Sequence, residues 1–253
     1  MSAGAARLAA LLRDARRAVA LTGAGISVPS GIPDFRTPLT GMWANVDPME
    51  VAHIDVFTRA PERFWGFYGP RFALLRDKRP NGAHHALAEL ERRGLLAAVI
   101  TQNIDGLHRQ AGTPDPIEVH GSLAIASCPA CGVREPREEV ARRVEAAGDG
   151  VPRCGCGAAL KPGVVLFGEL LPEAALERAF RLAGEADLLV CVGSSLEVHP
   201  VAGLPGVTLA AGGRVALVTQ GPTPYDADAA VKLDGDVEHE LEAVMAALEP
   251  QGV

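Results

Sequence analysis

The segment Leu95-Leu-Ala-Ala-Val-Ile-Thr-Gln-Asn-Ile-Asp105 joins an apolar run to a polar cluster. Its first part, Leu95 to Ile100, has the continuous apolar character of a parallel strand buried on both faces. Ligand chemistry in α/β sheets lies at the carboxyl ends of such strands, where this chain has two amides and a carboxylate. His120-Gly121 begins fifteen residues after Asp105. The segment therefore predicts a parallel sheet with a site at its carboxyl edge. For the segment taken alone, a polar loop with a solvated histidine is the alternative.

Composition limits the class of protein. The 253 residues are 48% hydrophobic and 22% charged, a globular balance, and they suffice for one large domain or a domain with a small insert. The net charge of −7 argues against binding to nucleic acid or to an anionic membrane, and it suits basic, lysine-bearing peptides. No apolar run has the length of a membrane span, and the start lacks the apolar core of a secretory signal. We expect a cytoplasmic protein.

Strand and helix patterns alternate along the chain. We expect strands at 18–22, 95–101, 117–119, 164–167, 188–192 and 214–218, and helices at 4–16, 61–76, 82–93, from Pro172 onward and at 237–248. Asn81 is the expected cap of the helix that stops at Gly94. Residues 28–58 are expected to form a long loop with short helical pieces, and loops of this length are usually functional. The alternation predicts an α/β fold with a doubly wound parallel sheet.

Two turns rich in small residues follow predicted strands. Gly23-Ala-Gly-Ile-Ser27 comes after the first strand, and Gly193-Ser-Ser195 after another. Glycines at such a position let the backbone approach a pyrophosphate. The third glycine of the usual fingerprint is missing, because Val28 stands there, so a plain tight turn is the alternative reading of the first motif. Two turns on one rim favour a nucleotide crevice.

Four of the five cysteines form two close pairs. Cys128-Pro-Ala-Cys131 and Cys154-Gly-Cys156 are separated by 22 residues. Four thiolates in two knuckles match a tetrahedral structural zinc site, and a redox pair is the alternative. The segment 124–163 is therefore expected to be a small metal-binding module inserted into the sheet domain. The fifth, Cys191, lies in an apolar run and is expected to be a buried hydrophobe.

Taken together, the motifs resemble the sirtuin family of NAD-dependent protein deacylases, bacterial deacetylases above all. The matching segments occur in family order over about residues 18–237: Gly23-Ala-Gly-Ile-Ser27, Gly31-Ile-Pro-Asp-Phe-Arg36, Thr101-Gln-Asn-Ile-Asp105, His120-Gly121, the four paired cysteines, Val164-Val-Leu-Phe-Gly-Glu169 and Gly193-Ser-Ser195. The resemblance implies a Rossmann-like domain of residues 1–123 and 164–253 and a small zinc-ribbon domain of residues 124–163. The cofactor loop 28–58 and the helices at 61–76 would border the cleft between the two domains.

The resemblance also implies an NAD site. Its pyrophosphate would lie near Gly23, Ala24 and Ser194, and its nicotinamide near Ile26, Asn103 and Asp105. Thr219 stands where the family usually has asparagine beside the adenosine ribose, which predicts weaker binding there. The residues expected to bind NAD are Gly23, Ala24, Gly25, Ile26, Ser27, Asp34, Phe35, Arg36, Gln102, Asn103, Ile104, Asp105, Gly193, Ser194, Ser195, Thr219, Gln220 and Val237.

The resemblance implies a deacylation reaction. The acyl oxygen of a modified lysine attacks the ribose carbon as nicotinamide leaves. His120 acts as general base on the ribose hydroxyls, since an imidazole has a pKa near neutrality, and Asn103 and Asp105 orient ribose and carboxamide. Hydrolysis then yields free lysine and O-acyl-ADP-ribose. Val165 and Phe167 would line the acyl tunnel, and the backbone through Gly168 would pair with the substrate peptide as an added strand.

Tyr68 and Arg71 bear on acyl specificity. Sirtuins that remove succinyl and malonyl groups bind the distal carboxylate with a Tyr-x-x-Arg pair, and positions i and i+3 share a helix face. Gly69 and Pro70 between them are poor helix-interior residues that could rotate the two apart. The hypothesis is a deacylase that accepts acetyl-lysine, with acidic acyl groups as a second class. An incidental pair on a solvated helix is the alternative.

Other functions stay open. A mono-ADP-ribosyltransferase would use the same crevice without an acyl-lysine. A non-catalytic NAD or ADP-ribose sensor would need no base, which the presence of His120, Asn103 and Asp105 disfavours. A zinc-dependent redox regulator is less favoured, because all four paired cysteines have a structural pattern. The expected partners are acyl-lysine peptides, with no nucleic acid and no membrane, and the chain is expected to be a monomer.

Overall fold

The computed structural model describes residues 2–34 and 46–249. Within them the elements follow in the order α1 (Ala3–Asp14), β1 (Ala18–Thr22), η1 (Ala24–Ser27), α2 (Pro48–Val51), α3 (Ile54–Arg59), α4 (Pro61–Leu74), η2 (Leu75–Asp77), α5 (Gly82–Arg92), β2 (Ala98–Thr101), α6 (Leu107–Ala111), β3 (Ile117–Glu118), β4 (Gly121–Ser127), β5 (Arg134–Pro136), α7 (Arg137–Ala146), β6 (Lys161–Val164), α8 (Glu173–Glu185), β7 (Leu188–Val192), η3 (Val201–Gly203), α9 (Leu204–Ala210), β8 (Arg214–Val218), β9 (Val231–Leu233) and α10 (Val237–Leu248).

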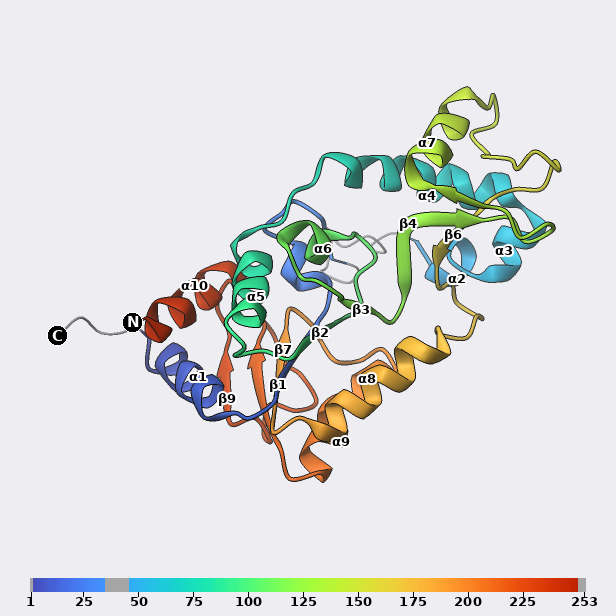
Figure 1. Cartoon of the computed structure of the whole chain (residues 1–253). Coiled ribbons are helices and arrows are strands. Elements are labelled where there is room, and N and C mark those ends of the chain that lie inside the picture. Colours follow the sequence, from blue (N-terminus) through green and yellow to red (C-terminus); the bar gives the residue numbers. More distant parts are fainter. Residues whose placement is uncertain (1, 35–45, 250–253) are drawn as a thin grey trace.

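A six-stranded sheet in the order β3-β2-β1-β7-β8-β9 forms the larger unit, and all of its neighbouring strands run parallel. Figure 1 shows α1, α5 and α10 on one side of this sheet and α8 and α9 on the other. Separate apolar cores fill the two sides. The doubly wound α/β fold predicted from the sequence is confirmed, and its winding reverses between β1 and β7.

The central strands are apolar on both faces because helices cover both faces. Every residue of β1 and β7 is buried. Their register pairs Ala18 with Leu188 and Thr22 with Val192, so the two strands end side by side. The predicted bounds of β1, β7, β8 and α10 are confirmed at each residue.

A second, antiparallel sheet of three strands, β5-β4-β6, carries the cysteine pairs. It packs with α4 and α7, and its core includes Phe64, Trp65 and Tyr68 of α4 beside Leu123 and Cys128. Figure 1 shows β4, β6 and α7 grouped with α2, α3 and α4 away from the large sheet. The predicted domain limits at 124 and 163 stay predictions, and β4 and β6 extend past them to Gly121 and Val164.

Two predicted strands need correction. The strand expected from Leu95 begins only at Ala98, because the amides of Leu95 and Leu96 donate to the Leu90 carbonyl at the end of α5. The prediction that Val164 to Phe167 forms a strand of the parallel sheet is wrong. Only Val164 is in a strand, β6, and that strand runs antiparallel to β4 in the small sheet.

Several helix ends follow the predicted chemistry. The Asn81 side chain accepts hydrogen bonds from the amides of Ala83 and His84 and so caps α5, and Pro172 precedes the first residue of α8. The mostly polar α7 was not predicted, and only Val140 of it is buried. Neither α9 nor the edge strand β9 was predicted. In the described part of the chain, no helix combines the length and the apolar character that crossing a membrane requires.

Candidate active site

The carboxyl ends of four parallel strands meet where the sheet winding reverses. Backbone bonds continue past the strand ends: the Gln102 amide donates to the Thr22 carbonyl at 3.0 Å, and the Gly23 amide to the Val192 carbonyl at 3.0 Å. The Gly193 amide likewise donates across to β8. The segments that follow β1, β2 and β7 are therefore held together at the edge where α/β sheets bind ligands.

The two small-residue turns interlock. The Gly25 amide donates to the Gly193 carbonyl at 2.8 Å. A Cβ atom on Gly25 would lie 2.8 Å from the Gly193 Cα, and one on Gly23 would lie 2.8 Å from the Ser194 Cβ. Gly193 itself has φ +60°, a conformation that favours glycine. Close packing thus explains these glycines. Val28, where a third glycine was missing, is 46% exposed and needs no such approach.

Three polar side chains form a buried cluster beside these turns. The Ser27 hydroxyl donates to Asp105 Oδ2 at 2.7 Å, and Asn103 Nδ2 donates to Ser27 Oγ at 3.1 Å and to the Gly23 carbonyl at 3.1 Å. Exposure is 1% for Ser27, 7% for Asn103 and 8% for Asp105. The Leu107 amide donates to Asp105 Oδ1 at 2.9 Å. The cluster fixes the orientation of the Asn103 amide and the Asp105 carboxylate.

The electrostatics of Asp105 reflect this burial. Removal from water raises the pKa of the Asp105 carboxyl, and its bonds from Leu107 and Ser27 act in the opposite direction. The pKa is raised on balance. Asp105 is therefore a partly compensated buried acid at the edge of the sheet, and such groups are typical of functional sites.

His120 follows β3 and reaches back to the segment after β2. Its Nδ1 lies 2.9 Å from the Gln102 carbonyl oxygen. A carbonyl only accepts, so Nδ1 carries the proton and the neutral ring has its basic nitrogen at Nε2. Burial lowers the pKa of His120, against the opposing effect of the Gln102 carbonyl. At neutral pH the ring is thus a partly exposed base of fixed tautomer. Gln102 in turn donates from Nε2 to Ser194 Oγ at 2.9 Å.

The residues predicted to bind the adenosine lie after β8 and at the start of α10. Thr219 follows β8, and its amide donates to the Leu233 carbonyl at 3.0 Å. Val237 begins α10 and is buried, and Gln220 and Ser195 are exposed. Ile104 packs beside the small-sheet core, and its carbonyl accepts a hydrogen bond from the Leu123 amide of β4. This bond links the segment after β2 to the small sheet. Asp34 is partly buried at the limit of the described chain.

The remaining cofactor-loop residues, Phe35 and Arg36, lie outside the described residues. The sequence prediction for them is therefore unchanged. The ligand roles of the other predicted residues also stay predictions, although the geometry brings the sets after β1, β2 and β7 into one cluster.

The predicted substrate segment adjoins His120. The Val165 amide donates to the His120 carbonyl at 2.9 Å. Phe167 is 40% exposed, and its peptide group bonds to Ala52 and Ile54, both at 2.9 Å. Gly168 has φ +86°, and a Cβ there would lie 2.6 Å from His53 Nε2. The segment therefore has a fixed backbone between His120 and the start of α3.

Tyr68 and Arg71 do lie on one helix, and Pro70 is accommodated inside it. The Tyr68 ring is buried and stacks on Phe72 with centroids 5.2 Å apart. The Arg71 guanidinium lies 3.6 Å above the Phe67 ring and donates to the Phe67 carbonyl at 2.6 Å. To meet an acyl carboxylate, the guanidinium would have to leave Phe67, so anion binding by the pair stays a prediction.

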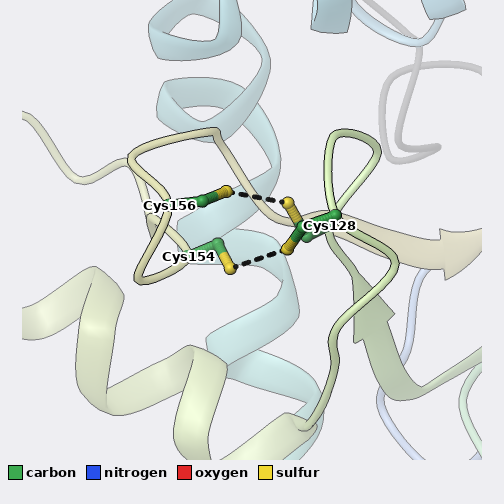
Figure 2. A group of neighbouring side chains, drawn as sticks. Cys128, Cys154 and Cys156 are labelled. Atoms are coloured by element: carbon green, nitrogen blue, oxygen red, sulfur yellow. Dashed lines mark hydrogen bonds between the residues drawn. The ribbon is translucent and has the colours of Figure 1, made fainter.

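The four paired cysteines come together as a metal site. Their sulfur atoms all lie within 4.8 Å of one another, and the sulfurs of Cys128 and Cys156, and those of Cys131 and Cys154, are 3.5 Å apart. Zinc–sulfur bonds of about 2.3 Å in a tetrahedron require sulfur separations of roughly 3.8 Å, so the donor set fits zinc. Figure 2 shows the sulfurs of Cys128, Cys154 and Cys156 converging between two facing loops. Cys191 is fully buried in β7, as predicted.

Sequence reasoning missed the buried residues whose hydrogen bonds support the segments around the Ser27–Asn103–Asp105 cluster. Asn81 Nδ2 donates to the Ile26 carbonyl at 2.8 Å, and Thr22 Oγ1 donates to Thr101 Oγ1 at 2.8 Å. His108 Nε2 lies 2.9 Å from Thr22 Oγ1. The only signal in the sequence was that buried polar residues end an otherwise apolar strand, as Thr22 and Thr101 do.

Comparisons with known proteins agree with this geometry. The family model described as "Sir2 family" matches residues 23–200. The chain is 46% identical to an NAD-dependent protein deacetylase of Sulfolobus acidocaldarius (88% of this chain, 86% of the relative), and 45% identical to an NAD-dependent protein deacylase of Thermus thermophilus (84% and 83%). A solved Sir2–p53 peptide–NAD+ complex superposes with a TM-score of 0.87 at 42% identity (94% and 96%). The structure of Sir2Tm bound to a propionylated peptide has a TM-score of 0.86 at 40% identity (96% and 98%). The chain belongs to the Sir2 family.

Proposed function

We propose that the protein is an NAD-dependent protein lysine deacylase that forms nicotinamide, O-acyl-ADP-ribose and free lysine. The observation that carries the proposal is His120, a neutral imidazole of fixed tautomer, placed beside the buried Ser27–Asn103–Asp105 cluster at the carboxyl edge of a parallel sheet. Relatives named as NAD-dependent deacetylases and deacylases support it.

NAD would supply the ribose carbon that accepts the acyl oxygen. The interlocked turns at Gly23 to Gly25 and at Gly193 allow the close backbone approach that a pyrophosphate needs. The nicotinamide end would face Ile26, Asn103 and Asp105. Thr219 and Val237 would bound the adenosine. This assignment follows the family motifs and the clustering of the residues in space.

His120 would serve as the base through Nε2. Its Nδ1 proton is held by the Gln102 carbonyl, so Nε2 is the nitrogen able to take a proton from a ribose hydroxyl. This would allow the hydroxyl to attack the former acyl carbonyl carbon, and Nε2 would hold the proton until the lysine amine leaves that carbon with it. The Asn103 amide would hold the ribose in place, because the Ser27 hydroxyl and the Gly23 carbonyl fix its orientation.

The substrate would be an acylated lysine in a peptide. Solved structures of similar proteins contain a p53 peptide or a propionylated peptide. The net charge of −7 suits basic peptides. Val165, Phe167 and Gly168 would contact the substrate beside His120. Both acetyl and longer acyl groups fit the names of the relatives and the propionylated peptide of the similar structure.

Zinc would have a structural role. The four thiolates close its coordination shell, so no position is left for a reacting group. The ion would join the loop after β4 to the loop before β6 and so hold the small sheet together. We also propose a cytoplasmic location, which the thiol pairs at metal spacing favour, and a monomeric state, which sedimentation of the purified chain would check.

The proposal is tested by mass spectrometry of products. The chain is incubated with NAD and matched peptides that carry acetyl-lysine, succinyl-lysine or free lysine. A deacylase forms O-acyl-ADP-ribose and releases nicotinamide only with the acylated peptides. Nicotinamide release with free lysine, and ADP-ribose attached to protein, would identify a mono-ADP-ribosyltransferase instead. NAD binding without any product would identify a sensor.

A further inference from the structure

The contact between α5 and α6 holds an unusual set of buried polar atoms. In residues 2–34 and 46–249, the buried side-chain nitrogens and oxygens without a hydrogen-bond partner are His84 Nε2, Glu91 Oε2, His108 Nδ1 and Thr113 Oγ1. His84 and Glu91 belong to α5, His108 belongs to α6, and Thr113 follows α6. Buried polar groups are nearly always paired, so a set confined to one contact requires an explanation.

The two imidazoles of this set face each other. Their ring centroids are 5.0 Å apart, and exposure is 0% for His84 and 2% for His108. Burial lowers the pKa of His84 to about 3 and that of His108 to about 4, so both rings are neutral at physiological pH. At this centroid distance, nitrogens of the two rings that point at each other would be about 3 Å apart, the length of a hydrogen bond, so a rotation of the rings would pair His84 Nε2 with His108 Nδ1.

The tautomer of His84 follows from its other nitrogen. The Asn81 amide, which can only donate, lies 3.4 Å from His84 Nδ1. Nδ1 therefore accepts, and the neutral ring has its proton on Nε2. His84 thus presents a buried N–H donor, and His108 Nδ1 is the buried acceptor that this donor needs.

The same reasoning continues from His108 toward the candidate active site. If Nδ1 of His108 accepts from His84, its proton is on Nε2, which lies 2.9 Å from Thr22 Oγ1. The Thr22 hydroxyl then donates to Thr101 Oγ1 at 2.8 Å, and Thr101 Oγ1 also accepts from the Asn103 amide at 3.0 Å. The donors thus run in one direction from His84 to Thr101, and the Asn103 amide donates to the same Thr101 oxygen from the other side.

The other end of the chain of bonds also reaches the site. The Asn81 side chain caps α5 through Oδ1 and donates from Nδ2 to the Ile26 carbonyl at 2.8 Å. Ile26 and Asn103 are two of the three residues expected to border the nicotinamide, the third being Asp105. With a bond from His84 Nε2 to His108 Nδ1, one continuous network would join both sides of that pocket through the N-terminus of α5.

We propose that His84 and His108 form a buried hydrogen-bond relay that fixes the positions of Asn103 and Ile26, and that both histidines are positioning residues for the reaction. The expected effect on the reaction rests on the proposed function, whereas the hydrogen bonds of the relay do not. The rings touch neither substrate nor cofactor, and they act through Thr22, Thr101 and Asn81.

The tautomers provide the first test. In ¹⁵N-labelled protein at pH 7, long-range ¹⁵N–¹H correlation spectra are expected to show His84 and His108 neutral and both protonated on Nε2. Assignment uses the His84→Gln and His108→Gln variants. A His108 ring protonated on Nδ1, or on both nitrogens, would overturn the relay. This measurement needs no catalytic activity, so it stands even if the proposed function fails.

Kinetics provide the second test. His108→Phe keeps an aromatic ring, slightly larger than imidazole, but removes both nitrogens, and His108→Gln keeps a donor near the Nε2 position. We expect kcat to fall about tenfold in His108→Phe, the effect of one lost hydrogen bond, with the KM for acyl-peptide within twofold of wild type. His108→Gln is expected to recover most of kcat. His85→Phe, on the exposed face of α5, is the matched control.

A folded His108→Phe protein with kcat within twofold of wild type would refute the positioning role. If that variant does not fold, Thr22→Val removes the relay hydroxyl at nearly constant volume and carries the same expectation of about a tenfold fall. Full kcat in Thr22→Val would likewise refute it. Wild-type protein without deacylase activity would instead refute the proposed function and leave the tautomer result intact.

Discussion

Gly25→Ala tests whether the two turns at the sheet edge must interlock. The added Cβ would lie 2.8 Å from both the Cα and the carbonyl oxygen of Gly193, a distance that Cβ atoms do not tolerate. Both neighbours are backbone, so the turns must separate. Overpacking of this kind costs about 1–3 kcal/mol, and for a chain of this size each kcal/mol lowers Tm by about 2–4 °C. We expect a fall of roughly 5 °C and a several-fold rise in the KM for NAD.

Gly66→Ala is the matched control for this substitution. Gly66 is exposed in α4 and no heavy atom lies within 4 Å of its added Cβ. Alanine there is expected to stabilise the helix by about 0.5–1 kcal/mol. Calorimetry and NAD titrations on both variants check the reasoning. If Gly25→Ala has the Tm and the KM of wild type, the turns do not need their close approach and the account of the glycines is wrong.

Three further predictions concern the zinc, the acyl pocket and the buried histidines. Cys156→Ser is expected to abolish zinc binding and to speed hydrogen exchange in β4 to β6 but not in β1; retained zinc would contradict the four-thiolate site. Arg71→Met is expected to lower succinyl-peptide turnover at least tenfold relative to acetyl-peptide turnover, and equal succinyl activity would remove Arg71 from the pocket. With the pKa of His84 lowered to about 3 and that of His108 to about 4, the unfolded chain binds protons below pH 6.5 that the folded chain does not. The free energy of unfolding should therefore decrease as the pH is lowered below 6.5, by up to about 1.4 kcal/mol per pH unit for each histidine, and less steeply in His108→Gln; equal free energies of unfolding from urea titrations at pH 7.0 and 5.5 would contradict the burial effect.

The parts of the fold that the sequence predicted are those with one strong physical cause. β1, β7 and β8 are buried on both faces, so their apolar runs end where the strands end. α10 packs a single face, and its predicted contact residues Val237 and Leu248 are buried. A run of apolar residues does not show which hydrogen bonds it makes. For this reason the sequence pattern predicts a strand at Leu95 and Leu96, although they complete the end of α5.

Elements governed by distant partners could not be read from local pattern. Val164 to Phe167 is apolar and follows an insert, yet its bonds go to the His120 carbonyl and to Ala52 and Ile54, far away in sequence. Only Val140 of α7 is buried, so the sequence of this helix has no strong apolar periodicity. The small-sheet core also contains Phe64 and Trp65, which the sequence reasoning placed outside the cysteine module.

The candidate site was predictable where it follows strand ends. Gly23, Asn103, Asp105 and Gly193 all come directly after predicted strands, and parallel strands bring those ends to one edge. The supporting residues were not predictable. His84 and His108 are separated by 24 positions and meet only because α5 packs on α6. No periodicity in the sequence distinguishes them from solvated histidines.

The most direct test of the central claim is the rate of lysine deacylation against pH in wild type and in His120→Ala. Because burial lowers the pKa of His120 below its usual value and the base acts in its neutral form, the wild-type rate should rise with pH with a midpoint below 6.5. His120→Ala should lose at least about 100-fold in kcat at pH 7.5 while it still binds NAD. An alanine variant that releases lysine at the wild-type rate would contradict the assignment of His120 as the base.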